Sequence, residues 1–477
     1  MAPVTTILAH LLAAGLLASV PPAARAASPA PQLQQLLAAE RLSAAAVSFV
    51  VIDAQSGQPV FGQNVDTPRS PASTIKLLTT FAGLDLLGPA YVWRTRALIR
   101  GELANGELDG DLILQGGGDP YMTLERWWSF ARRLRATGLK TIRGGIVVDN
   151  QAFSLKSIDP GAFDGRPHRA YNAVPDALMV NFQSIEFNLV PDGGHKRVNV
   201  SAEPAPVNLV VDNRIRYTEG PCSGAASRVN FDVDTADWAH VTFTGALSGR
   251  CEPRGFTRVL LNPAEYAYGT FLSLWRELGG SADGGLRIEA AAADARVLLS
   301  FDSLPLGEIV RLTNKYSSNV MARHLLLTVG AERFGFPATV EKGIAAIDEW
   351  AGSLGLPMDG VEIDNGSGLS RGARVSVAAM GRLLVAAYHS RYAPEFLASL
   401  PLAGMDGTLR SRLTGTPGGA VRLKTGHLDG VSGVAGYVAV PGGRTYVLVS
   451  LINDPEVDSG AGDAVHATLV KWLLENP

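Results

Sequence analysis

The sequence predicts a protein of the α/β (α+β) class, in which an antiparallel sheet built from both ends of the chain is flanked by helices and interrupted by inserted β-rich domains. An apolar, β-branched run over 47–53, a Ser-Gly-Gln turn and a second run over 59–63 predict a hairpin near the start of the chain, and an alternating pattern predicts three strands near its end, over 420–425, 434–440 and 445–452. Helical spacing of apolar residues marks three stretches between them, 306–328, 339–354 and 375–388. Because these end strands enclose helices, we expect both termini to share one sheet.

Further elements complete this outline. A helix is expected to begin near Ser73, where apolar residues follow at mostly helical spacing, and to end at about Gly88-Pro89. From about Tyr91 to Leu299 short apolar runs are broken by Gly, Asp and Pro, which indicates inserted β-rich material. A last helix is predicted over 463–474.

Composition bounds the class of protein. A chain of 477 residues with 46% hydrophobic and 18% charged residues can bury more than one core, so we expect two or three domains. The formal net charge of -3 is spread over both signs, without a basic cluster or an acidic tail. We therefore expect no nucleic-acid partner.

Residues 1–26 have the features of a signal peptide. An apolar run from Ile7 to Val20 precedes Ala24-Arg25-Ala26, a small-residue cleavage motif. The run is shorter than the roughly 20 apolar residues that a spanning helix needs, so we expect export to the periplasm and a mature chain without a transmembrane span. No Lys or Arg stands between Met1 and His10, and an uncleaved N-terminal anchor is the alternative.

The chain has two cysteines, Cys222 and Cys251. In an exported protein such an isolated pair can form a disulfide that closes one loop, and the alternative is two unpaired small apolar residues. Two cysteines cannot form a structural zinc site alone, and the eight histidines show no HExxH-like pattern. We expect neither a metal nor another cofactor.

The first candidate for chemistry is Ser73-Thr74-Ile75-Lys76. A serine hydroxyl needs a base within hydrogen-bond reach to become a nucleophile. Residues three apart on a helix share a face, so Lys76 would lie beside the Ser73 hydroxyl. The positive end of the helix dipole disfavours a charged lysine and favours an oxyanion. Alone, this spacing also occurs by chance.

Two further motifs follow. Ser317-Ser318-Asn319 begins a helical stretch, where a hydroxyl and an amide could relay a proton and hold a substrate amide; helix capping is the structural alternative. Lys424-Thr425-Gly426 lies at the end of a predicted strand whose edge could pair with an extended peptide. There Lys424 could attract a carboxylate and Gly426 allows close backbone approach, whereas an ordinary edge strand is the alternative.

Together and in this order, SxxK, SxN and KTG form the signature of serine penicillin-binding proteins and β-lactamases. Longer segments resemble one branch, the D-alanyl-D-alanine carboxypeptidase/endopeptidase type of low-molecular-mass class C penicillin-binding protein. These segments are 71–76, Gly116-Gly117-Gly118-Asp119-Pro120, Asn365-Gly366-Ser367-Gly368-Leu369-Ser370-Arg371 and Gly404-Met405-Asp406-Gly407-Thr408. The resemblance covers nearly the whole mature chain.

The resemblance implies a domain plan. A β-lactamase/transpeptidase-like domain would span 27–90 and 300–477, with one inserted β-rich domain over 91–190 and 260–299 and a second over 191–259. It also implies roles: Ser73 as acyl-enzyme nucleophile, Lys76 as its base, and Ser317 and Asn319 at the relay and substrate-amide positions. The family's middle motif is usually S-D-N, and here Ser318 takes the variable place.

The remaining roles concern substrate binding. The resemblance places Lys424 and Thr425 at the carboxylate-binding positions, and the backbone N–H groups of Ser73 and His427 in the oxyanion hole. Arg371 could bind an acidic substituent of the peptide or be a salt-bridged loop residue. Asp406 is expected to be a turn residue rather than a general acid.

The expected reaction is a two-step acyl transfer on peptidoglycan stem peptides or cross-bridges. β-Lactams are expected to act as covalent inhibitors that acylate Ser73. The competing hypotheses are a β-lactamase and a non-catalytic wall-binding scaffold. Homodimerisation, the carboxypeptidase-to-endopeptidase ratio and the third stem-peptide residue stay open at this point.

Overall fold

The computed structural model describes residues 30–236 and 238–476. The predicted signal peptide, 1–26, lies outside these residues. Within the described part of the chain, no helix combines the length and the apolar character needed to cross a bilayer.

Both ends of the chain form one antiparallel sheet, as predicted. Within the described residues its strands run in the order β17-β18-β19-β1-β2. Val47 pairs with Ile452 and Asp53 with Tyr446, so the first long strand lies directly against the last. The strands are β1 (Val47–Asp53), β2 (Pro59–Gln63), β17 (Val421–Leu428), β18 (Val431–Ala439) and β19 (Thr445–Asn453).

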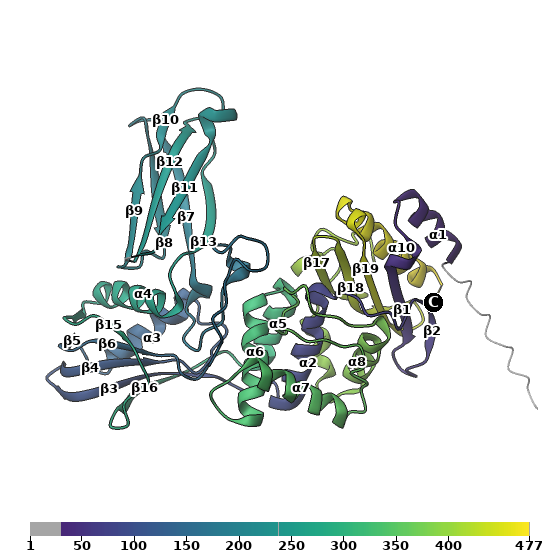
Figure 1. The fold of residues 1–477 in the computed structure, drawn as a ribbon, viewed down its shortest axis with the longest axis horizontal. Helices are drawn as coiled ribbons and strands as arrows, with labels where there is room; N and C mark the ends of the chain where they lie inside the picture. Colours follow the sequence, from purple (N-terminus) through teal and green to yellow (C-terminus); the bar gives the residue numbers. More distant parts are fainter. Residues whose placement is uncertain (1–29, 237, 477) are drawn as a thin grey trace, which may run out of the picture.

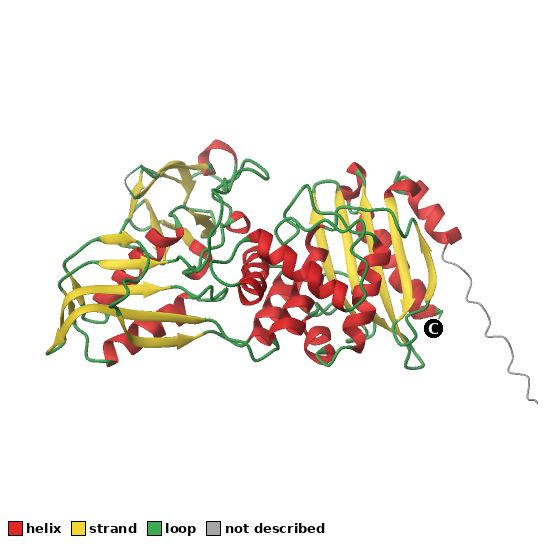
Figure 2. Ribbon diagram, turned by 60° about the horizontal axis from the view of Figure 1, so that its bottom comes forward, coloured by secondary structure: helices red, strands yellow, loops and turns green. Residues whose placement is uncertain are grey.

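Helices cover both faces of this sheet (Figure 2). Alternate residues of β1 enter different cores: Val47 and Val51 pack with α1 (Ala30–Ala39) and α10 (Ala461–Glu475), whereas Val50 packs on the opposite face. That second face is covered by a larger group of helices, namely α2 (Lys76–Leu87), α5 (Leu306–Tyr316), α6 (Asn319–Phe334), α7 (Val340–Ser353), α8 (Val377–His389) and α9 (Ala393–Ser399). The predicted helix–sheet–helix layering is confirmed.

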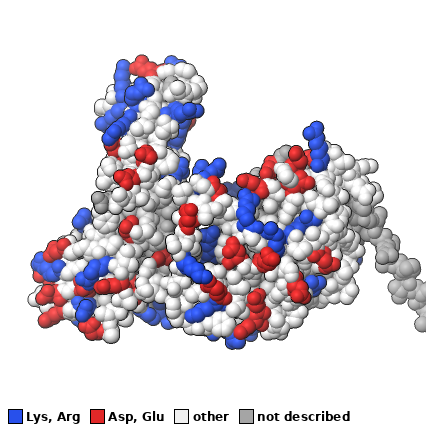
Figure 3. Space-filling view, viewed as in Figure 1, with Lys and Arg blue, Asp and Glu red and all other residues white. Residues whose placement is uncertain are grey.

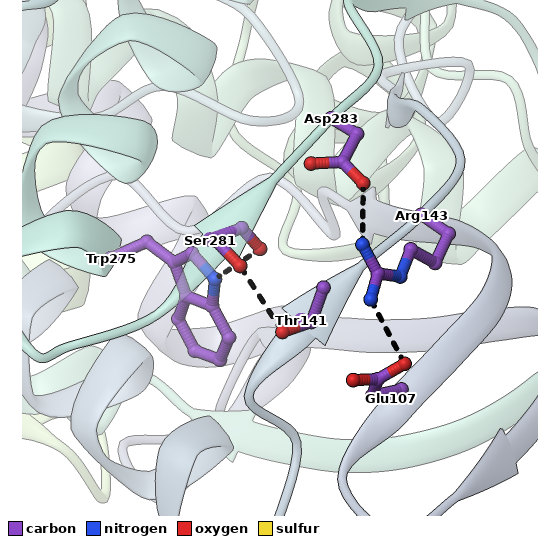
Figure 4. Close-up of polar contacts among 6 residues, drawn as sticks. All are labelled: Glu107, Thr141, Arg143, Trp275, Ser281 and Asp283. Atoms are coloured by element: carbon purple, nitrogen blue, oxygen red, sulfur yellow. Dashed lines mark hydrogen bonds and ion pairs between the residues drawn. The ribbon is translucent and has the colours of Figure 1, made fainter.

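The first insertion contains a sheet built from two distant segments of the chain. Arg143 bridges Glu107 at 3.0 Å and Asp283 at 3.1 Å, and Ser281 donates a hydrogen bond to Thr141 (Figure 4). Exposed ion pairs like these contribute little to stability because water and salt screen them, so buried apolar residues supply most of the stability. The elements are β3 (Arg94–Ala104), β4 (Glu107–Gln115), α3 (Leu124–Ala136), β5 (Thr141–Ile142), β6 (Ile146–Asp149), α4 (Pro263–Glu277), β14 (Ser281–Ala282), β15 (Leu286–Ile288) and β16 (Arg296–Asp302).

The second insertion stands away from the rest of the molecule as an arm (Figure 1). Phe187, Phe243 and Phe256 pack against one another between its two small sheets. Cys222 and Cys251 form a disulfide in this arm. Its strands are β7 (Ser184–Asp192), β8 (Arg197–Glu203), β9 (Leu209–Asn213), β10 (Arg216–Thr218), β11 (Val229–Asp234), β12 (Ala239–Ser248) and β13 (Arg254–Val259).

The topology moves the expected boundaries between these parts by a few residues. We expected the arm to begin at residue 191, but β7 pairs along its length with β8 and β13 and so places its start at about Ser184. At the other end β16 pairs with β3 as far as Asp302, beyond the expected limit of 299. Strand pairing between distant segments decides both limits, and local composition does not reveal it.

Surface charge is mixed on the face seen in Figure 3, where Lys and Arg side chains alternate with Asp and Glu over all three parts of the molecule. This pattern agrees with the balanced net charge of the sequence.

Candidate active site

Ser73 lies on one turn of 3-10 helix, η2 (Ala72–Ile75), that leads directly into α2. The helix predicted near Ser73 is therefore present, with a tighter first turn. Ala72 has a φ of +44°, a conformation that costs energy for a residue with a Cβ and that clusters at functional sites. The turn leaves the Ser73 side chain half-buried, at the edge of a cavity.

Lys76 lies beneath this turn and is fully buried. Its Nζ lies 2.8 Å from the Oγ of Ser73 and 2.8 Å from the Oδ1 of Asn319, and it also donates to the backbone carbonyl of Ser367. Burial lowers the pKa of Lys76 well below its usual value, and the positive charges of Lys424 and Arg323 lower it further. The environment therefore favours the neutral amine.

Ser317 separates two helices that the sequence pattern predicted as one. It ends α5 with a φ of +58°, in the left-handed region, and thereby breaks the predicted 306–328 helix before α6 begins. Ser318, rather than Ser317, caps α6 by accepting a hydrogen bond from the N–H of Met321. The capping interpretation thus applies to Ser318, while Ser317 is free to face the site.

The third motif lies on β17, at the edge of the sheet. The Nζ of Lys424 donates to the Oγ of Ser317 and to the carbonyl of Thr425, each at 2.8 Å. Thr425 hydrogen-bonds to Thr408 through their hydroxyls at 2.8 Å. Lys424 is fully buried, and this burial lowers its pKa to about 7.

Gly426 allows β17 to approach the turn that carries Ser73. A Cβ added at this position would lie 2.6 Å from the carbonyl oxygen of Pro71 and 3.1 Å from the backbone nitrogen of Ser73. Since real Cβ atoms essentially never approach backbone so closely, a side chain here would force the strand and the turn apart. The sequence-based reason for a glycine at 426, close backbone approach, agrees with this geometry.

A cavity of about 480 Å³ joins these groups. Ser73, Ser317, Asn319 and His427 line it, and Lys424 contacts Ser317, so the structure brings all three motifs to one place. The side chain of His427 is exposed and donates to none of the catalytic groups among the contacts of the described residues. Its place beside the cavity agrees with a role for its backbone.

Sequence reasoning missed one wall of this cavity. Phe163, Asp164, Arg166 and Tyr171 come from the first insertion and line the same space. The Nδ2 of Asn319 donates to the carbonyl of Tyr171 at 3.2 Å, which also orients the Oδ1 toward Lys76. No short-range pattern in 163–171 signals this contact, because the segment reaches the site only through the tertiary fold.

Two of the segments that carry the family resemblance contribute groups to the site. The segment containing Asn365 to Arg371 supplies the Ser367 carbonyl to Lys76, and that containing Gly404 to Thr408 supplies the Thr408 hydroxyl. Gly116 and Gly117 pack tightly on backbone: a Cβ on Gly116 would lie 2.2 Å from the Ala177 carbonyl oxygen, and one on Gly117 would lie 2.2 Å from the Arg94 carbonyl oxygen. The resemblance marked these segments without assigning roles to Ser367 or Thr408.

Arg371 and Asp406 lie on different sides of the site. The Arg371 guanidinium stacks 4.8 Å from the centre of the Phe163 ring and lies 3.9 Å from the Asp429 carboxylate. Asp406 accepts from Lys315 at 2.6 Å and from the N–H of Leu402 at 2.8 Å. The contacts of Asp406 agree with the expected role of a turn residue. Arg371 lines the cavity.

The fold and this geometry define a class of protein. A serine hydroxyl that contacts a buried lysine amine, with a second serine–lysine pair beside a sheet edge, is the arrangement of an active-site serine hydrolase with a lysine base.

Comparisons with known proteins narrow this class. The model of the D-Ala-D-Ala carboxypeptidase 3 (S13) family matches residues 30–476. The D-alanyl-D-alanine carboxypeptidase of Actinomadura sp. (strain R39) is 31% identical over 431 residues, 87% of this chain and 78% of that protein. D-alanyl-D-alanine carboxypeptidase DacB of Haemophilus influenzae is 26% identical over 438 residues, 89% of each chain. The crystal structure of penicillin binding protein 4 (dacB) from Haemophilus influenzae shares the fold, with a TM-score of 0.76, 24% identity, and coverage of 92% of this chain and 99% of that one.

The chain therefore belongs to the D-Ala-D-Ala carboxypeptidase 3 (S13) family. It is a serine-type D-Ala-D-Ala carboxypeptidase with the class C penicillin-binding protein architecture, as the resemblance implied. These matches argue against a non-catalytic wall-binding scaffold.

Proposed function

We propose that Ser73 performs the acyl transfer with Lys76 as its base. The hydroxyl proton passes to the Lys76 amine while Oγ bonds to the carbonyl carbon of the penultimate D-alanine. The C–N bond to the terminal D-alanine then breaks, and its nitrogen takes up a proton. Water hydrolyses the resulting ester, releasing the shortened peptide and restoring the Ser73 hydroxyl.

The hydrogen bonds of Lys76 are the observation that carries this proposal. The Asn319 Oδ1 and the Ser367 carbonyl can only accept, so a neutral Lys76 must use its two N–H groups on them. Its lone pair is then left for the remaining partner, the Ser73 hydroxyl, at 2.8 Å. The site thereby directs the base toward the proton that must be removed.

Ser317 and Lys424 would act on the leaving-group side of the scissile bond. Ser317 contacts Lys424 and lies on the same cavity as Ser73, so it can return a proton to the leaving amine. Lys424 and Thr425 would bind the terminal carboxylate of the substrate. The backbone N–H groups of Ser73 and His427 would form the oxyanion hole, which Gly426 keeps narrow.

The same site is proposed to act on cross-bridges and to bind β-lactams covalently at Ser73, in the periplasm after export. Penicillin binding protein 4 (dacB) from Haemophilus influenzae has been solved in complex with a novel β-lactam, which supports the inhibitor part of the proposal. Arg371, exposed beside the cavity, is available to an acidic substituent of the stem peptide.

Product analysis tests the function. We expect the purified protein to release D-alanine from an N-acylated tripeptide ending in D-Ala-D-Ala, because Ser73 and Ser317 line one cavity and each contacts a buried lysine amine. A cross-linked muropeptide dimer is expected to yield monomers at the same site. Chromatography with mass detection measures both products. If folded protein forms neither product, the proposal is contradicted. If the protein turns over benzylpenicillin rapidly but cleaves no peptide, a β-lactamase is favoured.

Lys424 gives the reaction a pH dependence. Its pKa of about 7 means that the ammonium is lost as pH rises through neutrality, and carboxylate binding weakens with it. We expect KM for the tripeptide to rise about tenfold from about pH 7 to about pH 8.5. The control is Lys424→Arg, whose side chain stays charged over this range and whose KM should be nearly constant. A wild-type KM that does not change with pH would refute this assignment.

A further inference from the structure

A second cavity, of about 700 Å³, adjoins the active site. One wall is the 154–175 segment of the first insertion, and the opposite wall is formed by α6, the start of α7 and the 364–371 loop. Its floor includes the apolar side chains of Leu326 and Leu327 from α6. Lys156 and Glu341 form an exposed ion pair of 2.7 Å that joins the two walls.

The two cavities share Phe163, Leu369 and Arg371. The stacked pair of Phe163 and Arg371 therefore stands between them. Arg371 is more than half exposed, its ion pair with Asp429 is long, at 3.9 Å, and its hydrogen bond to the Asp429 carbonyl is 3.3 Å long, so weak contacts hold the Phe163–Arg371 pair in place. A ligand bound at Ser73 can continue past this partition into the second cavity.

Arg323 is the distinctive polar group of this second cavity. It lies on α6 one turn after Asn319, and thus on the same face of the helix. Within the described part of the chain its hydrogen bonding is poor: Nη1 reaches the Ala173 carbonyl at 3.4 Å, and the buried Nε has no partner. A guanidinium has five donors and stays charged, so the protein itself uses little of the hydrogen-bonding capacity of Arg323.

Asp364 lines the same cavity but forms no ion pair with Arg323 within 4.0 Å among the described residues. Burial lowers the pKa of Arg323, and the charge of Asp364 raises it. The cavity thus presents a cation and an anion to its contents over an apolar floor. Such a lining matches a peptide that carries a carboxylate and N–H donors.

The spacing along the substrate agrees with this match. Four residues of α-helix separate Asn319 from Arg323, a rise of about 6 Å. Asn319 contacts the base at the scissile bond. An extended peptide advances at most about 3.3–3.6 Å per residue, so the residue two before the penultimate D-alanine reaches the depth of Arg323.

We propose that the cavity between the 154–175 segment and α6 is a second peptide subsite, in which Arg323 binds a carboxylate carried by the second residue of the stem peptide. This subsite rests on the proposed function, because the peptide must also reach Ser73. It would make the enzyme prefer stem peptides whose second residue has a free carboxylate over those in which it is amidated.

Paired peptides test the subsite. Two pentapeptides ending in D-Ala-D-Ala, with a free or an amidated carboxylate on the second residue, are compared with the short tripeptide. Wild-type protein should hydrolyse the free acid with a kcat/KM about tenfold above that of the amide, the worth of one charge-assisted hydrogen bond. Arg323→Gln should abolish this preference, and Arg323→Lys should keep part of it. Using the ratio of two peptides cancels any effect of the Arg323 charge on Lys76.

A cavity-filling variant supplies an independent readout. Ile158→Trp alters an exposed residue that lines the cavity and should lower kcat/KM for the free-acid pentapeptide about tenfold while leaving the tripeptide and benzylpenicillin acylation unchanged. The matched control, Ile288→Trp, changes an equally apolar exposed residue on β15 and should alter none of these rates.

Each failure has a distinct meaning. Wild-type protein that cleaves the tripeptide but does not distinguish the pentapeptides would overturn the subsite and leave the proposed function standing. The subsite is also overturned if Ile158→Trp slows both substrate lengths equally. Wild-type protein that cleaves no peptide would overturn the proposed function, and the subsite with it.

Discussion

Replacing Ser73 with Ala is expected to abolish the benzylpenicillin adduct and to reduce D-alanine release by about 10⁴-fold or more. In the proposed mechanism this hydroxyl bonds to the substrate carbonyl. The other side chain that lies 2.8 Å from the Lys76 amine, among the described residues, is that of Asn319, and an amide oxygen cannot replace the hydroxyl as nucleophile. Intact-protein mass spectrometry after brief incubation with benzylpenicillin, followed by peptide mapping, measures the adduct and locates it.

The control for this experiment is Ser201→Ala, an exposed serine on β8 of the arm, which should be acylated like the wild type. A stable penicilloyl group on the wild-type Ser73 peptide would support a penicillin-binding protein over a fast β-lactamase. An adduct that persists in Ser73→Ala would show that another residue is the nucleophile.

Replacing Lys76 should have the second-largest effect. Lys76→Arg keeps a positive charge and long side chain, but a guanidinium cannot lose its proton in a protein. If Lys76 acts as the base, we expect this variant to be acylated about 10²–10⁴-fold more slowly, the usual range for losing general base catalysis. The acylation rate constant from the mass-spectrometric time course is the measurement.

Lys76→Ala separates the chemical role from a structural one. Small primary amines added to the solution should partly restore its acylation, because they can occupy the vacated space beside Ser73 and accept its proton. Thermal unfolding of each variant checks that the fold persists, and Lys471→Ala on the exposed face of α10 is the control. Full activity in Lys76→Arg, or no rescue of a folded Lys76→Ala, would argue against the base.

Burial also accounts for the lowered pKa values of the two lysines of the site, Lys76 and Lys424. Both are fully buried, and for both the lower pKa arises first from desolvation. Lys76 additionally faces the positive charges of Lys424 and Arg323, which favours its neutral form. Lys424 has a pKa of about 7 and is therefore partly charged at neutral pH, which suits the carboxylate-binding role proposed for it.

Several features of the fold could be predicted from near neighbours in the chain. The apolar, β-branched run and the turn after it predicted β1 and β2 with the observed bounds, and the alternating pattern located the three strands at the C-terminal end to within a few residues. The contact between Ser73 and Lys76 follows from a spacing of three residues at a helix start. These features depend on local backbone geometry, which periodicity reports directly.

Other features were not accessible in this way. The helical periodicity of 306–328 continues across Ser317, so it hides the left-handed residue that divides α5 from α6. The pairing of β7 with β13 and the approach of Tyr171 to Asn319 join segments far apart in the sequence. Only the packing of whole domains makes such contacts favourable.

The sequence by itself thus determined the chemical class: three short motifs, their order, the sheet shared by the termini and the presence of insertions. The tertiary structure decided which groups complete the site, including the Ser317–Lys424 contact, the Ser367 carbonyl on Lys76 and the insertion wall beside Phe163. The physical reason is the separation along the chain between the residues in contact. A motif encodes its own turn or strand, whereas a contact between distant segments forms only when burial of the domains offsets the chain entropy of bringing them together.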